Sequence, residues 1–405
     1  MTRLGRLLVL NDQVLQRQGE SFGCADAYLR FVLGFLPHCQ ELVLASRVVG
    51  EPLGPYRLPR DARVRVAALP DYGGIKDLYL RAHRYRPAIR AALDREVPRA
   101  DALWLNYSHP VSLAALRRAR PGQRTFALLR GNYVKDARLR NPGPWGRVAA
   151  GIARINRLRF ARLVERRGTQ LFGVGREALR DLERRHGRAR EVIPTMIPRA
   201  ELDGLCRGLT RSEGAGRIRL LFVGRVDPEK DLDTLLDALR RARARGTDVR
   251  LDVAGEGTER ARLAALADAA GLSPHLTWHG HVVHGPALYD LYRRADALVI
   301  SSRTEGLPAV LIEAGLFGLP TVTTDVGGIA AFVEDGVSGV IVPPGDAEAL
   351  ARGFTRLAES PDLRRAMGER ARALVGRRCL EDEVERVVAI LTAPPGSSGS
   401  SRTSG

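Results

Sequence analysis

Short apolar segments that end at turn residues alternate along this chain with longer segments of helical periodicity. In the first half the apolar segments are RLLVL (6–10), ELVLAS (41–46), ALWLN (102–106) and TFALL (125–129). In the second half they are RIRLLFVG (217–224), VRLDVAG (249–255), LTWHG (276–280), ALVIS (297–301) and TVTTD (321–325). Strands that alternate with helices form parallel sheets covered by helices on both faces. We therefore expect an α/β fold built on two such sheets.

The two series of strands predict two domains. The first series ends near residue 195, a Pro- and Gly-rich bridge covers 196–216, and the second sheet restarts at Arg217. We expect an N-terminal domain over 1–195, a hinge over 196–216 and a C-terminal domain over 217–379. Residues 380–393 have the pattern of one amphipathic helix, and the last segment, 394–405, has the composition of a disordered tail.

Composition indicates the cellular environment of the protein and the kinds of partner that it could bind. The net charge of +18 predicts attraction to phosphates, whether on nucleotides, nucleic acids or anionic lipids. The opening segment MTRLGRLLVLND breaks its apolar run at Asn11 and Asp12, so it does not resemble a signal peptide. Four cysteines without metal-like spacing favour reduced thiols in a cytoplasmic protein: Cys24, Cys39, Cys206 and Cys379.

Ligands of open parallel sheets bind beyond the carboxyl ends of the strands, so the residues that follow each strand matter most. After the strand at 217–224, Gly224 allows close approach of the backbone, while Arg225 and Lys230 offer a planar fork and a point charge for phosphate oxygens. An ordinary charged surface loop is an equally good interpretation of this segment alone. Gly255 and Gly257 form a weak partial match to a dinucleotide motif, which we interpret as a tight turn.

The stretch SSRTEGLPAVLIEA (301–314) places a loop and a helix start at the end of another strand. Ser302 and Glu305 belong to the loop, and Pro308 is of a type favoured in a first helical turn. The backbone amides of Gly306 and Leu307, with the helix dipole, suit an anion or a sugar hydroxyl. The alternative is that Glu305 only caps the helix.

A second carboxylate, Glu313, follows Glu305 by eight positions. Helical rise would separate the two by about 12 Å, which is too far for two acids that act on one bond. Glu313 could lie on a solvated face, but its neighbours in VLIEAGLFG are mostly apolar, so we expect it to have a partner.

In order and spacing, the motifs VGRVDPEKD, VAGEG, ADALVISSRTEGLPAVLIEAGLFGLPTVTTDVGG and DGVSGVIVPPGD resemble the donor-binding domain of family 4 glycosyltransferases. The resemblance covers about residues 217–375 and includes the E-x7-E signature, whereas the first half resembles the family only in its β-α pattern. It implies the GT-B fold, with two Rossmann-like domains whose parallel sheets face each other across a cleft.

The resemblance also implies roles for individual residues. Arg225 and Lys230 would hold the diphosphate of a nucleotide-sugar and stabilise the leaving phosphate. Glu305 would bind hydroxyls of the donor sugar, and Glu313 would bind the ribose. The further donor contacts would come from Gly224, Gly255, Gly257, Ser302, Gly306, Leu307 and Pro308. The family retains anomeric configuration without a metal, so we expect no cofactor and interpret the D-x-D of Asp231 and Asp233 as chance.

In the first half, the resemblance brings Gly23 toward the diphosphate. It makes Asn106, His109 and Arg130 candidates for contact with the acceptor or the sugar. One departure is that no acid follows the Gly327-Gly328 turn, where the family often has one.

We therefore expect a retaining glycosyltransferase that acts on a hydroxyl of a lipid-linked or polysaccharide precursor. Natural-product glycosylation, a non-catalytic sugar-nucleotide binder, a phosphorylase and an epimerase are the alternatives. A nucleic-acid-binding protein is disfavoured because only 5% of residues are aromatic and no known binding motif is present.

Two basic stretches, 76–99 and 147–167, are open to two interpretations. In the second stretch, apolar residues follow helical spacing at Val148, Ile152, Ile155 and Leu158. They would either form a core stripe under a solvated face or dock the protein peripherally on an anionic membrane.

Overall fold

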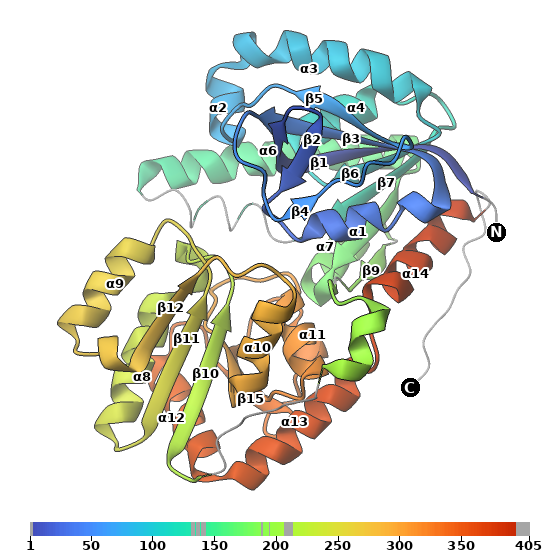
Figure 1. Ribbon diagram of the computed structural model, residues 1–405. Coiled ribbons are helices and arrows are strands. Elements are labelled where there is room, and N and C mark those ends of the chain that lie inside the picture. Colours follow the sequence, from blue (N-terminus) through green and yellow to red (C-terminus); the bar gives the residue numbers. More distant parts are fainter. Residues whose placement is uncertain are drawn as a thin grey trace. The chain divides into compact units, whose positions relative to one another are not determined.

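The computed structural model describes residues 3–130, 134, 138, 143–187, 189–193, 195–205 and 214–393 (Figure 1). The chain divides into two compact units. The first comprises Met1–Leu105, Ala114–Phe126 and Glu381–Gly405, and the second comprises Asn106–Leu113 and Ala127–Leu380. The predicted tail at 394–405, Cys206 and part of the predicted hinge lie outside the described residues, so the domain boundaries of the sequence analysis remain predictions.

The first sheet is built around a long strand, β1 (Leu4–Gln18). This strand pairs in parallel with β3 (Cys39–Val49) and β6 (Ala102–Asn106), and β3 pairs in parallel with β5 (Val64–Leu69). Next to β6 the sheet continues through β7 (Arg124–Leu129), β8 (Gln170–Val174) and β9 (Arg190–Val192). Its helices are α1 (Tyr28–Leu33), α2 (Ile75–Leu80), α3 (Ala82–Glu96), α4 (Pro110–Arg118), α6 (Pro144–Arg167) and α7 (Gly175–His186).

The segment after residue 10 forms a β-hairpin, although the predicted apolar segment ends at that residue. Strand β1 continues to Gln18, the chain turns at Gly19 with a positive φ of 59°, and β2 (Ser21–Cys24) returns antiparallel to β1. A two-residue strand, β4 (Tyr56–Arg57), extends the hairpin. Buried and more exposed side chains alternate from Gln13 to Gln16, and this period of two favours a strand.

The second sheet has six parallel strands: β10 (Arg217–Val223), β11 (Asp248–Ala254), β12 (Leu276–Gly280), β13 (Ala297–Ile300), β14 (Thr321–Thr324) and β15 (Gly339–Val342). Their spatial order is β12-β11-β10-β13-β14-β15, so the order reverses between β10 and β13. Such a reversal is the topological switch point at which open α/β sheets bind ligands. The strands predicted at 217–325 are confirmed, each to within one residue at either end.

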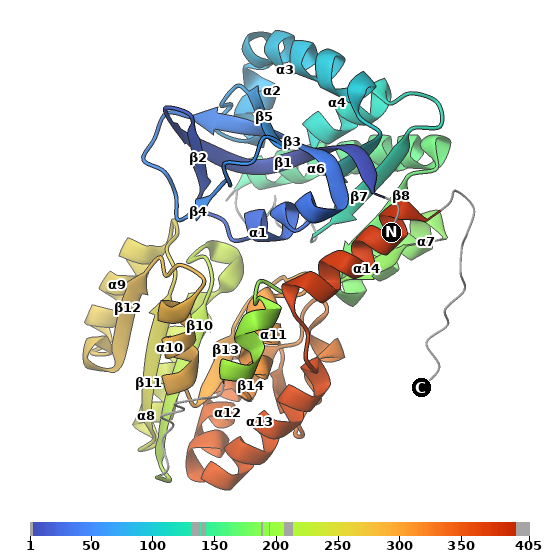
Figure 2. The ribbon, with the colours of Figure 1, turned by 45° about the vertical axis from the view of Figure 1, so that its right-hand side comes forward.

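Helices cover both faces of this second sheet (Figure 2). They are α8 (Leu232–Ala244), α9 (Arg260–Ala269), α10 (Pro286–Arg294), α11 (Ala309–Leu316), α12 (Ala347–Glu359) and α13 (Pro361–Val375). Helices α8 and α12 pack side by side on one face, and α10 and α11 lie on the other. Leu220, Leu235 and Phe354 are fully buried in the core between the sheet and the first pair of helices.

The last described helix, α14 (Leu380–Thr392), matches the helix predicted at 380–393. Almost all of it belongs to the first compact unit. Within that unit the Arg124 guanidinium donates hydrogen bonds to the carbonyls of Leu391 and Ala393 near the end of α14. Among the described residues, none of the helices combines the length and the apolar character that a bilayer crossing requires.

Candidate functional site

The loops that follow β10 and β11 pack backbone against backbone. Gly224 has a φ of 154°, and its N–H donates to the Ala254 carbonyl at 3.0 Å. A Cβ atom on Gly255 would lie 1.8 Å from the Gly224 oxygen, and one on Gly257 would lie 2.3 Å from the Val226 oxygen. Real Cβ atoms do not approach so closely, so the two glycines at 255 and 257 are needed for the loops to meet.

Arg225, in the loop after β10, is held by two acids of the same loop. One terminal nitrogen donates to Asp227 Oδ2 at 2.7 Å and the other donates to Glu229 Oε1 at 2.7 Å. Glu229 is buried, whereas the Arg225 side chain is 54% exposed. The guanidinium is therefore oriented by the protein and still reachable by a ligand.

Lys230 and Glu305 form the central contact of the site. The Lys230 ammonium lies 2.5 Å from Glu305 Oε1, and the Ser302 hydroxyl donates to the same oxygen at 2.6 Å. The Lys230 and Glu305 side chains are only 17% and 10% exposed. The Ser301 hydroxyl also donates to the Lys230 carbonyl at 2.7 Å. These contacts join the loops after β10 and β13, the two strands of the switch point.

The glycines of the Glu305 loop allow further close approaches. The Gly328 N–H donates to the Gly306 carbonyl at 2.6 Å. A Cβ atom on Gly306 would lie 2.4 Å from the Arg130 oxygen, and one on Gly327 would lie 2.3 Å from the Glu305 oxygen. The structure therefore brings the backbone of Arg130, a predicted acceptor contact, next to the Glu305 loop.

Helix α11 starts later than the sequence suggested. It begins at Ala309, and Pro308 is an extended N-cap residue with φ −69° and ψ 124° rather than a residue of the first turn. Leu307, a predicted donor contact, is buried ahead of the helix. Because the chain from Glu305 to Pro308 is not helical, the separation of about 12 Å estimated from helical rise does not apply to the two glutamates.

Glu313, on α11, is 3% exposed and has partners inside the protein. The Tyr292 hydroxyl donates to its Oε2 at 2.8 Å, and His284 Nε2 lies 3.2 Å from its Oε1. The Tyr292 ring stacks on Phe317 with 5.1 Å between the ring centroids. Complete burial and the neighbouring Glu313 charge raise the pKa of Tyr292 well above its usual value, so its hydroxyl remains a donor.

The acids of the D-x-D sequence are each held by a different arginine. Arg303 Nε lies 2.9 Å from Asp231 Oδ2, and Arg262 lies 2.6 Å from Asp233 Oδ2. The Arg262 hydrogen bond holds the pKa of Asp233 below its usual value. In the part of the chain that the structure describes, no group of three His, Cys, Asp or Glu residues could hold a metal ion.

The remaining predicted contacts, Asn106, His109 and Gly23, lie in or near different elements of the first half of the chain. Asn106 ends β6 and is buried, with its N–H donating to the Ser112 hydroxyl at 3.2 Å. His109 is half-buried ahead of α4, and its Nδ1 accepts the Val111 N–H at 3.2 Å, a local contact that fits a role in starting the helix. Gly23 lies in β2, in the first compact unit, and is not a loop residue.

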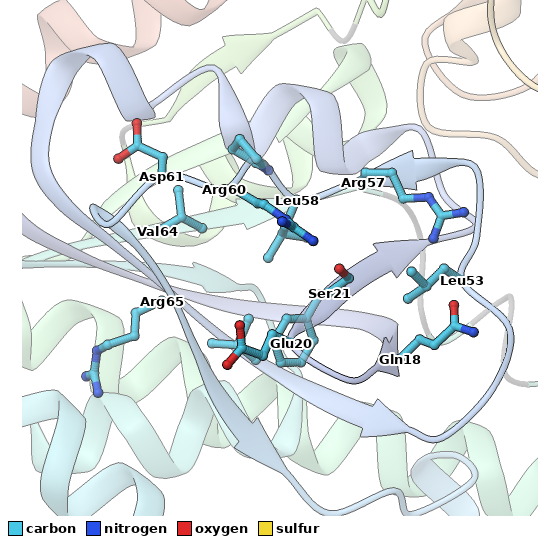
Figure 3. A pocket seen from close by; sticks show the side chains of 13 residues that line it. Gln18, Glu20, Ser21, Leu53, Arg57, Leu58, Arg60, Asp61, Val64 and Arg65 are labelled. Atoms are coloured by element: carbon cyan, nitrogen blue, oxygen red, sulfur yellow. The ribbon is translucent and has the colours of Figure 1, made fainter.

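An open cavity of about 720 Å³ lies in the first compact unit (Figure 3). It is lined by the turn between β1 and β2, by residues 57–61 and by β5. Arg57, Arg60 and Arg65 contribute cations to its wall, and Leu58 and Val64 contribute apolar surface. The residues that line it include none of the predicted site residues, and the sequence pattern did not single it out.

Comparison with known families identifies the part of the chain that carries the Lys230–Glu305 contact. The profile of the family described as "Glycosyl transferases group 1" matches residues 212–374. Among curated proteins, an alpha-D-kanosaminyltransferase of Streptomyces kanamyceticus is 34% identical over 157 residues, which is 38% of this chain and 40% of that protein. A glycogen synthase of Mycobacterium tuberculosis is 34% identical over 183 residues, which is 45% of this chain and 43% of that protein. The chain thus spans less than half the length of these relatives.

Solved structures resemble the chain over nearly its whole length. The match to the structure of Anabaena HepE in complex with UDP and glucose covers 97% of this chain and 100% of the HepE chain, with 16% identity and a TM-score of 0.67. The match to sucrose-phosphate synthase from Thermosynechococcus elongatus covers 96% of this chain and 98% of the synthase chain, with 18% identity and a TM-score of 0.71. The predicted fold class is confirmed, because the chain has the GT-B fold, and its residues 212–374 match the family described as "Glycosyl transferases group 1".

Proposed function

We propose that this protein is a glycosyltransferase that transfers a sugar from a nucleotide-diphospho-sugar to a hydroxyl group, with retention of anomeric configuration. The observation that carries the proposal is the Lys230–Glu305–Ser302 cluster at the switch point of a group 1 glycosyl transferase segment. A nucleotide-sugar donor is further supported by the complex of HepE, a protein of the same fold, with UDP and glucose.

Charge stabilisation of the departing diphosphate is the main catalytic effect in this proposal. Lys230 and Arg225 bind the diphosphate oxygens, since both cations lie on the loop after β10, the strand at the switch point. Glu305 and the amides of Gly306 and Leu307 bind hydroxyls of the donor sugar. Glu313 binds the ribose hydroxyls through oxygens that Tyr292 and His284 hold in place.

The acceptor in this proposal is a lipid-linked or polysaccharide precursor at the cytoplasmic face of a membrane. A second candidate is a small natural product, which is favoured by the match to an alpha-D-kanosaminyltransferase. The two differ in whether the acceptor is anchored in lipid. Activity on acceptors in detergent micelles and in free solution would therefore separate them.

A thermal-shift screen of nucleotide-diphospho-sugars tests the donor. We expect one nucleotide class to raise the melting temperature of the wild-type protein. We expect Lys230→Ala and Glu305→Ala to stay folded and lose turnover, while Lys76→Ala, a substitution in the first compact unit, keeps turnover. Full activity of either site variant would refute the proposed roles.

Analysis of the product by NMR tests whether the anomeric configuration is retained, and chelation with EDTA tests whether turnover requires a metal. We propose that no metal is essential, so turnover with EDTA should equal turnover without it. An inverted anomeric centre in the product, or loss of turnover in EDTA, would contradict these two parts of the proposal.

A further inference from the structure

Helix α6, whose place in the fold Figure 1 shows, carries several apolar side chains that are exposed to solvent. Val148, Ile155 and Leu158 are 49%, 50% and 43% exposed, and Trp145 at the start of the helix is 64% exposed. Intervals of seven and three residues place the first three within one arc of the helix. The interpretation of this stripe as a core stripe is therefore wrong.

A different face of α6 is buried. It consists of Asn156, Phe160 and Val164, which follow one another at four-residue intervals. Tyr107 packs against Phe160 with 4.9 Å between their ring centroids. The helix is thus fixed to its unit through one face and leaves an apolar face outward.

Cations surround the outward apolar residues. Helix α6 contains seven arginines and one acid, Glu165. Five of these arginines are exposed and have no acid within ion-pairing distance among the described residues: Arg147, Arg154, Arg159, Arg162 and Arg166. By contrast, most exposed arginines of the second sheet's helices are paired, as Arg240 is with Asp237 and Arg262 is with Asp233.

We infer that α6 docks this protein flat on an anionic lipid bilayer. The helix is about 36 Å long by helical rise, so its outward face could lie along a membrane surface. The apolar side chains would enter the boundary between headgroups and acyl chains, and the arginines would bind lipid phosphates. That the bilayer also carries the acceptor rests on the proposed function, whereas the docking itself does not.

The apolar residues favour a membrane over a nucleic acid. Arginines alone would suit either polyanion, because both present phosphates. Contact with a phosphate backbone would leave the apolar surface of Val148, Ile155 and Leu158 in water. Entry into a bilayer would remove that surface from water, which is favourable in free energy.

Flotation of the full chain with vesicles tests the inference. We expect binding to vesicles of phosphatidylcholine and phosphatidylglycerol, and none to phosphatidylcholine alone. Ile155→Gln with Leu158→Gln should weaken vesicle binding at least about tenfold, because two apolar side chains no longer enter the bilayer. Arg154→Gln, Arg159→Gln and Arg162→Gln together should weaken it about 100-fold.

Matched variants elsewhere control for solubility and net charge. Leu266 and Val337 are 42% and 49% exposed, so Leu266→Gln with Val337→Gln matches the apolar variant and should keep vesicle binding. A second control replaces three exposed arginines by glutamine, at Arg294, Arg352 and Arg356. It matches the change in net charge of the triple variant in α6, and it should also keep vesicle binding. Thermal melts of every variant exclude unfolding as the cause.

Tryptophan fluorescence provides a second readout. Trp145 is exposed and Trp104 is fully buried, so a blue shift on anionic vesicles that Trp145→Phe removes would support insertion of α6. The inference is overturned if vesicles are not bound, or if the Ile155 and Leu158 variant binds them as well as wild type. It is also overturned if that variant loses binding to vesicles and to RNA alike. Nucleotide-sugar stabilisation of the same preparations separates failure of docking from failure of the proposed function.

Discussion

The Lys230–Glu305 contact allows a quantitative test of the site through a double-mutant cycle. The variants are Lys230→Met, Glu305→Gln and the two combined. An exposed ion pair contributes about 0–1 kcal/mol, and breaking a fully buried one costs about 3–5 kcal/mol. The two side chains are 17% and 10% exposed, so we expect each single substitution to lower the free energy of unfolding by about 2 kcal/mol.

The double variant should be destabilised by less than the sum of the singles. Each single substitution leaves one poorly solvated charge without its partner, and the double removes both charges. We therefore expect a coupling of about 1–2 kcal/mol, with Ser302 limiting the loss by still bonding residue 305. Urea denaturation of the four proteins measures it. Strict additivity would show that the two side chains do not interact in solution, and the geometry of the site would then be wrong.

Three further predictions concern neighbouring parts of the second unit. Tyr292→Phe removes a donor to the buried Glu313 carboxylate and should cost about 1.5–3 kcal/mol in urea denaturation; a loss under 0.5 kcal/mol would contradict the hydrogen bond. Gly255→Ala should cost about 3 kcal/mol because its Cβ would meet the Gly224 oxygen, and an unchanged urea midpoint would contradict this packing. Burial lowers the pKa of His186, so the unfolded state binds more protons below pH ~6.5. The free energy of unfolding should then fall as the pH drops below ~6.5, and it should fall less in His186→Gln. An equal fall in that variant would show that His186 is not the cause.

The fold of the second half was predictable because the strands at the centre of its sheet are buried on both faces, as β13 and β14 are at every residue. Such strands appear in the sequence as continuous apolar runs, and β10 to β14 matched those runs. The β1–β2 hairpin was missed because strand pairing depends on where the partner lies, and QRQGESFG has no long apolar run.

The burial of α6 shows a limit of periodicity. The stripe of Val148, Ile155 and Leu158 is more apolar than the face that is buried, which includes Asn156. Periodicity identifies an amphipathic helix, but it does not say whether the apolar face meets a core or another surface.

The partners of Glu313 were also beyond sequence reasoning. An apolar context predicted that this acid has a partner, and it has one in Tyr292. The tyrosine lies 21 positions earlier on another helix. Only the packing of α10 beside α11 brings the two together, so no local spacing could reveal it.

The cations proposed to hold the donor are paired with the protein's own acids. Lys230 contacts Glu305, so a diphosphate that takes the ammonium would leave Glu305 free for hydroxyls of the sugar. The diphosphate and Glu305 would then compete for Lys230, and the sugar hydroxyls would bind Glu305 after the diphosphate has displaced it from the lysine. Removing the Glu305 charge should release Lys230, so Glu305→Gln should bind the free nucleoside diphosphate more tightly than wild type while losing transfer. Calorimetric titration with the nucleotide found in the donor screen measures this. Weaker binding by Glu305→Gln would show that the carboxylate supports the diphosphate site and does not compete with it.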